Sequence, residues 1–203
     1  HNTSALDCWV SMNYRPVWYN KRFIMVASLF ITFLFILPSL SNAYTRKERD
    51  QFQRSIVDFR SRLNPGYKKA HRKKTKYIIV HTSELNLKTT LRVVSKGKHL
   101  HNGRRTNGGH AHYVIARSGR TYRILDKKYV ADHAGRSMWN GEKNINRVSV
   151  GMELVGYHDG NITARQYKSV GLLIEILKNI YRLDDRDALT HSQIAYTQSS
   201  KAV

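Results

Sequence analysis

Three residues of this sequence have the types that can activate a water molecule: His81, Glu153 and His191. Each histidine follows a short apolar run, YIIV before the first and ALT before the second, and strand ends of this kind hold side chains rigidly at the rim of a sheet. Two neutral imidazoles and one further ligand bind Zn²⁺ with an open position, where bound water has a pKa of about 7. A carboxylate outside the ligand set can take the proton of that water. Either histidine alone is more simply structural, but the three together predict a metal site with a general base.

The segment around Glu153 reads SVGMELV over residues 149–155 and alternates between two faces, as a strand does. One face is apolar and holds Val150, Met152 and Leu154. The opposite face holds Ser149, Gly151 and Glu153. We therefore expect the carboxylate to look over an open glycine floor instead of packing into a core.

The elements that position these residues alternate between strand and helix. Strand patterns occupy residues 77–80, 111–117 and 121–125, and Ser118-Gly119 forms the turn between the last two. Residues 87–94 fit a helix. A capping box at Thr163 and Gln166 begins a longer helix, whose apolar residues recur at helical spacing up to about residue 182. The pattern predicts a single α/β domain with a central mixed sheet of about five or six strands flanked by helices, with a metal at one rim beneath a shallow groove.

Two segments precede this domain. Residues 44–62 place Phe52, Ile56 and Phe59 on one face of a predicted amphipathic helix. Residues 68–76 hold six Lys or Arg and no acid, which indicates a solvated linker or, alternatively, a patch attracted to an anionic wall or membrane. The chain therefore divides into residues 1–43, a basic N-terminal helix and linker over residues 44–75, and the α/β domain over residues 76–203.

Five strings occur in an order and at spacings typical of one enzyme family: YIIVHTS, AHYVIARSGRTYRI, DHAGRSMWNG, NRVSVGMELVG and THSQIAY. Over about residues 76–196 the chain resembles the type 2 N-acetylmuramoyl-L-alanine amidases, which include phage lysozyme-like amidases and are similar to peptidoglycan recognition proteins. The resemblance implies hydrolysis of the amide bond between the lactyl group of N-acetylmuramic acid and L-alanine in peptidoglycan or muropeptides. It places His81 and His191 on two Zn²⁺ ligands and Glu153 on the catalytic glutamate.

The same resemblance covers two further histidines. It implies that His112 orients a strand and that His133, in DHAG, lies in the groove near the substrate. Residues 135–139 would line this groove, which makes Arg136 and Trp139 candidate substrate-binding residues, with a purely structural turn as the alternative.

The sequence departs from the family pattern after His191. The family supplies a third ligand, Asp or Cys, a short distance further on. This chain reads SQIAYTQSSKAV there, with Lys201 where an acid is expected and no acid or thiol in the string. Two interpretations stay open: the natural sequence continues to a third ligand, or the domain binds peptidoglycan without cutting it.

The N-terminal segment has the layout of a secretory signal peptide. Residues 23–37 are nearly all apolar, follow several basic residues and precede the small stretch that ends at Ala43. This run is shorter than the roughly 20 residues that span a bilayer, so we expect export to the periplasm or the outside with cleavage near Ala43. The alternative is a membrane anchor through residues 23–40. The signal reads best from Met12, so residues 1–11 are set aside as upstream sequence.

The composition restricts the partners. The 203 residues include 35 Lys and Arg against 14 Asp and Glu, a formal charge of +21, which predicts an anionic partner. Nucleic acid is disfavoured by the predicted export and by the lack of a helix-turn-helix or aromatic-platform pattern. We expect peptidoglycan or muropeptides within an anionic envelope, and a monomer. The only cysteine, Cys8, precedes the signal, so packing and not a disulfide must stabilise the domain.

Overall fold

A six-stranded mixed sheet organises the protein. The computed structural model describes residues 44–100 and 102–195. The strands are β1 (Val57–Asp58), β2 (Tyr77–Thr82), β3 (Tyr113–Ile115), β4 (Thr121–Arg123), β7 (Ser149–Leu154) and β8 (Ala188–Thr190), in the order β1-β4-β3-β7-β2-β8. All neighbouring strands run parallel except β3 and β4, which form the predicted hairpin. The predicted α/β class and strand number are confirmed.

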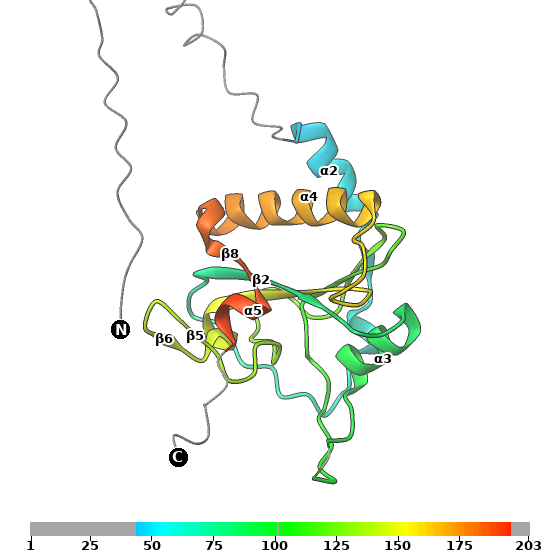
Figure 1. Ribbon diagram of the computed structural model, residues 1–203, viewed down its shortest axis with the longest axis vertical. Coiled ribbons are helices and arrows are strands. Elements are labelled where there is room, and N and C mark those ends of the chain that lie inside the picture. Colours follow the sequence, from blue (N-terminus) through cyan, green and yellow to red (C-terminus); the bar gives the residue numbers. More distant parts are fainter. Residues whose placement is uncertain (1–43, 101, 196–203) are drawn as a thin grey trace, which may run out of the picture. The chain divides into compact units, whose positions relative to one another are not determined.

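Helices cover both faces of this sheet (Figure 1). Helices α2 (Arg46–Ser55) and α4 (Ala164–Tyr181) lie on one side, and α3 (Leu87–Lys96) lies on the other with the hairpin of β5 (Met138–Trp139) and β6 (Glu142–Lys143). The short helix α5 (His191–Ile194) directly follows β8, and 3₁₀ turns occupy Arg60–Arg62, Ile145–Val148 and Asp185–Asp187. Among the described residues, no helix has both the length and the apolar character that a membrane span requires. The predicted signal or anchor segment lies outside those residues.

The apolar face predicted for β7 packs into the core of the protein. Val150, Met152 and Leu154 are buried in one cluster with residues of α4: Leu172, Leu173, Ile176 and Leu177. The predicted capping box begins α4, since the Thr163 hydroxyl accepts from the backbone of Gln166 and the Gln166 side chain accepts from that of Thr163. Tyr167 fits the helical spacing of the apolar residues predicted to pack on the sheet, but it is 73% exposed. The opposite face of β7 is thus left free for polar residues.

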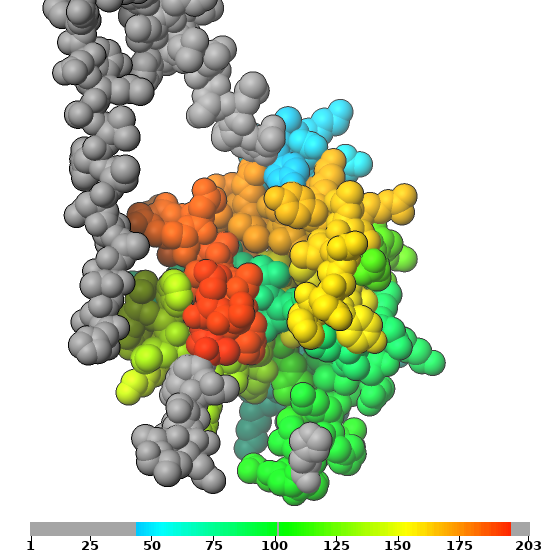
Figure 2. All heavy atoms as spheres, in the orientation of Figure 1, coloured from blue at the N-terminus to red at the C-terminus, as the bar shows by residue number. Residues whose placement is uncertain are grey.

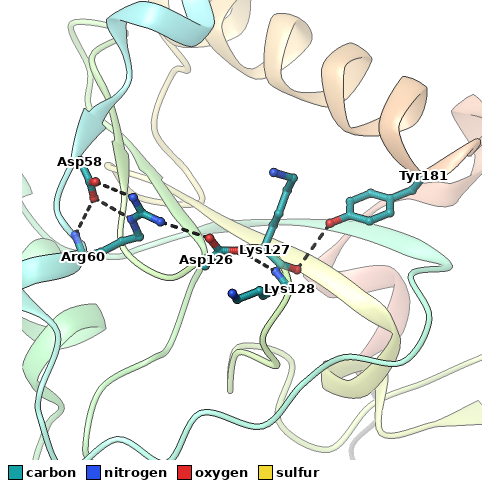
Figure 3. A network of polar contacts seen from close by, with 6 residues as sticks. All are labelled: Asp58, Arg60, Asp126, Lys127, Lys128 and Tyr181. Atoms are coloured by element: carbon teal, nitrogen blue, oxygen red, sulfur yellow. Dashed lines mark hydrogen bonds and ion pairs between the residues drawn. The ribbon is translucent and has the colours of Figure 1, made fainter.

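The segment before residue 76 is more closely integrated than the sequence indicated. Helix α2 ends at Ser55 and not near residue 62, because the β-branched pair Ile56-Val57 leaves the helix and β1 pairs with β4. Figure 3 shows how Arg60 then bridges Asp58 and Asp126, which ties the end of β1 to the loop after β4.

The predicted linker is also anchored by a partly buried arginine. The Arg72 guanidinium donates to the carbonyls of Tyr129 and Ser149, and its burial lowers its pKa. The interpretation of residues 68–76 as a simply solvated linker was therefore wrong for Arg72.

Candidate functional site

His81 and His191 are brought together by two neighbouring parallel strands. His81 is the fifth residue of β2, and His191 follows β8, whose Thr190 lies opposite Val80. The two strands therefore deliver their histidines to the same rim of the sheet. The Nδ1 atoms of the two rings are 2.7 Å apart, and the ring centroids are 4.7 Å apart. Both Nδ1 atoms thus face one common point.

A chain of hydrogen bonds continues from the far side of the His81 ring. His81 Nε2 lies 2.9 Å from His133 Nδ1, His133 Nε2 lies 3.0 Å from the Ser149 hydroxyl, and this hydroxyl donates to the Ile145 carbonyl at 2.6 Å. Because the Ser149 proton is committed to Ile145, its oxygen accepts from His133 Nε2–H. His133 Nδ1 is then an acceptor for His81 Nε2–H. This pattern leaves the lone pair of His81 Nδ1 directed at His191.

His133 itself is held from two sides. The Asn146 side-chain oxygen accepts from the backbone nitrogens of His133 and Ala134, at 3.0 and 2.8 Å. The His133 ring lies directly over Gly151, where any Cβ would meet ring carbons well inside contact distance. The expectation of an open floor at Gly151 was therefore wrong, because the His133 ring fills it. Asn146 and Ser149 were missed as site residues, although both stand within the NRVSVGMELVG string.

Burial keeps these imidazoles neutral. His81 is 6% exposed, and burial followed by repulsion from His191 lowers its pKa to about 3. Burial lowers the pKa of His191 as well, and it holds that of His133 well below the usual range. A neutral imidazole is the form that coordinates a metal ion, so the rings are prepared for that role without loss of a proton.

Glu153 lies beside His81 on the neighbouring strand. The two residues are register partners of β7 and β2, so their side chains leave the same face of the sheet. Among the described residues Glu153 Oε2 has no hydrogen-bond partner although it is buried. Burial raises the Glu153 pKa to about 8, while the charge of Lys98 works in the opposite direction. A carboxyl group with this environment can exchange a proton near neutral pH.

A cavity of about 520 Å³ opens in front of Glu153. It lies between the ends of β2 and β7 and the outer part of α3, and its lining includes Glu84, Arg92, Lys98 and His133. Its wall therefore carries both positive and negative groups next to the rim of the sheet where His81 and His191 meet, which we call the histidine rim. The wall also includes the apolar residues Leu85, Val93 and Val94, so a ligand with both charged and apolar groups finds partners in this cavity.

The two other predicted substrate residues lie on a different side of the histidines. Arg136 is exposed and Trp139 is partly buried in β5, and neither lines the cavity in front of Glu153. Ser137 instead forms a β-bridge with Ala195, which attaches this segment to the end of α5. Figure 2 shows α5 at the surface beside the β5–β6 segment. Substrate contact by Arg136, Trp139 and His133 stays a prediction.

The described residues do not complete a metal site. No group of three or more His, Cys, Asp or Glu side chains with the geometry to hold a metal ion is found within residues 44–100 and 102–195. The Nδ1 atoms of His81 and His191 converge at 2.7 Å, whereas two nitrogens bound to one tetrahedral zinc ion stand roughly 3.3 Å apart, so the two rings must separate slightly to admit an ion. The segment after His191, where the third ligand was sought, extends beyond residue 195 and thus outside the described residues.

His112 lies below the site as predicted for a strand-orienting residue. Its Nδ1 accepts from the Gly151 backbone at 3.0 Å, and its Nε2 lies 2.9 Å from the Tyr129 carbonyl. Both ring nitrogens are thus occupied by the backbone, which leaves none for a metal ion.

Comparisons with known proteins agree with this geometry. Residues 71–202, more than half of the chain, match the family described as Amidase_2, N-acetylmuramoyl-L-alanine amidase. No curated protein matches the sequence significantly.

Solved structures share the fold at low sequence identity. A selenomethionine derivative of AmpD has a TM-score of 0.59 and 19% identity, over 73% of this chain and 87% of that one. The endolysin amidase LysCS from Clostridium intestinale has a TM-score of 0.55 and 21% identity, over 70% and 84%. Peptidoglycan recognition protein-LE, in complex with tracheal cytotoxin, has a TM-score of 0.54 and 17% identity, over 71% and 86%. The resemblance indicated by the five sequence strings is confirmed.

Proposed function

Because the chain belongs to the N-acetylmuramoyl-L-alanine amidase family, we propose that it is an exported, Zn²⁺-dependent amidase that releases stem peptides from peptidoglycan or muropeptides. The observation that carries the proposal is the meeting of His81 and His191 Nδ1, 2.7 Å apart, beside the unpartnered carboxyl of Glu153. The bond cut joins the lactyl group of N-acetylmuramic acid to L-alanine.

Each residue of the site has a distinct task in this reaction. His81 and His191 would hold Zn²⁺ through Nδ1, together with a third ligand. Residues 192–203 offer no Asp, Glu, Cys or His for that position. When bound, the ion polarises the scissile carbonyl and acidifies a water molecule. Glu153 accepts the proton of that water on its unpartnered oxygen and returns it to the leaving amine of L-alanine. His133 acts as a positioning residue, because it fixes the tautomer and the orientation of His81.

The substrate class is supported by the mixed charge of the cavity. Stem peptides carry several carboxylates, and Arg92 and Lys98 supply cations in the wall next to Glu153. The relative peptidoglycan recognition protein-LE is described in complex with monomeric diaminopimelic acid-type peptidoglycan, which makes such a muropeptide a suitable test ligand. The formal charge of +21 would also favour retention in an anionic envelope.

The test is a release assay on the whole chain. The purified chain is loaded with Zn²⁺, its metal content is measured, and it is incubated with muropeptides and with sacculi while free stem peptide is followed by mass spectrometry. We expect stem peptide only with metal and only with Glu153 intact. Stoichiometric zinc without any release would overturn the enzyme proposal.

A second candidate function is a peptidoglycan-binding module that does not cut. It is favoured by the described residues, which offer two candidate ligands and no third. Two imidazoles alone bind zinc weakly, so this alternative predicts sacculus binding without stoichiometric metal and without peptide release. Metal analysis and co-sedimentation with sacculi on the same preparation separate the two functions.

A further inference from the structure

We propose that processing between Ala43 and Tyr44 creates a new N-terminus whose α-ammonium group is bound by Glu175, on the face of the sheet opposite the catalytic site. The inference rests on the proposed export and is independent of amidase activity. It concerns a modification site and a receptor for its product, both argued from contacts of Tyr44.

The backbone nitrogen of Tyr44 already meets a carboxylate. It donates to Glu175 Oε2 at 3.1 Å, across 131 positions of the sequence. In an unprocessed chain this nitrogen carries one hydrogen and no charge. After cleavage it would carry three hydrogens and a positive charge, and charge-assisted hydrogen bonds are roughly twice as strong as neutral ones. The carboxylate is therefore better matched to a chain end than to a peptide bond.

The ring of Tyr44 packs against Gly171 of α4, and we call this position the seat of the tyrosine ring. Gly171 lies in the middle of α4, where glycine costs about 1 kcal/mol relative to alanine. A Cβ at Gly171 would lie 2.5 Å from the Tyr44 hydroxyl, so glycine is what admits the tyrosine ring. Gly171 and Glu175 are four residues apart and share one helical face. One face of α4 thus receives both the ring and the amino nitrogen of the same residue.

Arg49 closes this arrangement from α2. Its guanidinium donates to the Tyr44 carbonyl and pairs with the second oxygen of Glu175, and both side chains of the pair are mostly buried. Figure 2 shows α2 against α4 in this part of the molecule. The Glu175 carboxylate therefore has one oxygen for Arg49 and one for the nitrogen of Tyr44.

The position of Tyr44 along the chain favours a carboxylate partner for a new ammonium group. Tyr44 directly precedes Thr45, the N-cap of α2, where the partial positive charge of the helix end disfavours a further cation. A carboxylate in contact with the new ammonium group would offset this repulsion.

The sequence supplies a suitable cleavage site. Residues 41–43 read SNA after the apolar run, which fits the small residues that leader peptidases require. In the reaction, water adds its oxygen to the carbonyl carbon of Ala43, the bond to Tyr44 nitrogen breaks, and this nitrogen takes up both protons of the water and becomes an ammonium group. The Ala43 carboxylate leaves with the leader.

The first measurement locates the chain end. The full chain is produced in a secreting bacterial host, and the exported protein is analysed by N-terminal sequencing and intact mass. We expect Tyr44 as the first residue. A retained leader, a different first residue or the absence of export would each overturn the proposal, and none of these results depends on whether the protein hydrolyses peptidoglycan.

The second measurement tests the receptor. The α-amine of the processed protein is labelled with an acylating reagent at pH 7 in the wild type, in Glu175→Gln and in the control Glu142→Gln, whose carboxylate pairs with Lys76 elsewhere. An ion pair that raises the pKa of the α-amine by one unit slows labelling about tenfold. We expect this slowing in the wild type and in Glu142→Gln, and its loss in Glu175→Gln. Equal rates in all three proteins would exclude the ammonium contact.

A third measurement addresses the seat of the tyrosine ring. Gly171→Ala in the middle of a helix normally stabilises a protein, but here we expect the melting temperature of the processed protein to fall. A rise would show that Tyr44 does not occupy the seat in solution. Amidase activity is measured alongside as a separate readout, because Glu175 and Gly171 lie on the face of the sheet opposite His81.

Discussion

The polar face of β7 has two ends that differ in how their polar atoms are satisfied. At the Ser149 end, the hydroxyl and both ring nitrogens of His133 have hydrogen-bond partners, and the glycine next to them is covered by the ring. At the Glu153 end, four residues along the same strand, one buried carboxylate oxygen has no partner among the described residues.

This difference indicates that the Ser149 end of β7 positions the site, whereas the Glu153 end carries a reactive group. A fully bonded buried network has one favoured arrangement, and it transmits that arrangement to the His81 ring. A buried polar atom without a partner costs about 1–3 kcal/mol, and such a cost is typical of groups that act on a ligand. The unpartnered oxygen of Glu153 therefore lowers the stability of the fold, whereas the bonded network at Ser149 fixes the geometry of the site.

The largest effect on activity is expected at the Glu153 end of β7, which we call the unbonded end because its carboxylate oxygen has no hydrogen-bond partner among the described residues. Glu153→Gln keeps the shape of the side chain but cannot accept a proton, so stem-peptide release should fall by about 10²–10⁴-fold, the usual contribution of a general acid–base group. Muropeptide binding should persist, and calorimetric titration would measure it. Glu84→Gln is the matched control, because Glu84 lines the same cavity but is bonded to Thr82 and His158. An equal loss in both variants would contradict the assignment.

At the bonded end, His133→Phe keeps a ring over Gly151 but removes the partner of His81 Nε2. Loss of such an outer partner weakens metal binding by about 10–100-fold, so Zn²⁺ affinity measured by competition with a chromophoric chelator should fall by this factor. His158→Phe makes the same exchange at an exposed histidine and should leave the affinity unchanged. If both variants bind zinc as the wild type does, the hydrogen-bond chain does not position the ligand.

Gly151, which the His133 ring covers, lies between Ser149 and Glu153 on the polar face of β7. Gly151→Ala would push a methyl group into the His133 ring, so we expect a loss of about 1–3 kcal/mol in the free energy of unfolding by urea. Gly160→Ala is the control, since a Cβ there would find its nearest neighbour at 3.3 Å. A small and equal effect in both variants would mean that the His133 ring can move away without cost.

The sequence could indicate the histidine rim because strand ends and alternation are local patterns. The YIIV and ALT runs placed His81 and His191 each at the end of a strand, and SVGMELV placed Glu153 on the polar face, but that the two strands are neighbours is shown only by the structure. The hydrogen-bond chain behind His81 could not be predicted in this way. Ser149 and Asn146 are ordinary polar residues, and their roles follow from a ring that arrives from a loop elsewhere in the chain.

The prediction of one helix over residues 44–62 was wrong for a related reason. Phe52, Ile56 and Phe59 fit one helical face, but pairing between β1 and β4 competes with the helix, and this long-range contact leaves no periodic signal. The sequence likewise indicated a solvated charge at Arg72, which is partly buried, because its carbonyl partners lie far away in the sequence. Local patterns predicted only the first part of this segment, the helix α2, whereas the pairing of β1 and the partners of Arg72 depend on the tertiary fold.

The smallest expected effect concerns stability at the unbonded end. Burial raises the Glu153 pKa from an ordinary value of 4.5 to about 8, so the folded state resists ionisation while the unfolded state does not. Below pH 4.5 the group is protonated in both states and costs nothing extra. As the pH rises from 4.5 to 8 the unfolded chain releases its proton first, and the folded state loses stability relative to Glu153→Gln. In chelator-treated protein at pH 8 we expect the variant to be more stable than the wild type, with the difference shrinking toward pH 4.5. Urea unfolding at several pH values checks this, and a gap that stays constant with pH would show that Glu153 is solvated and not desolvated in the folded protein.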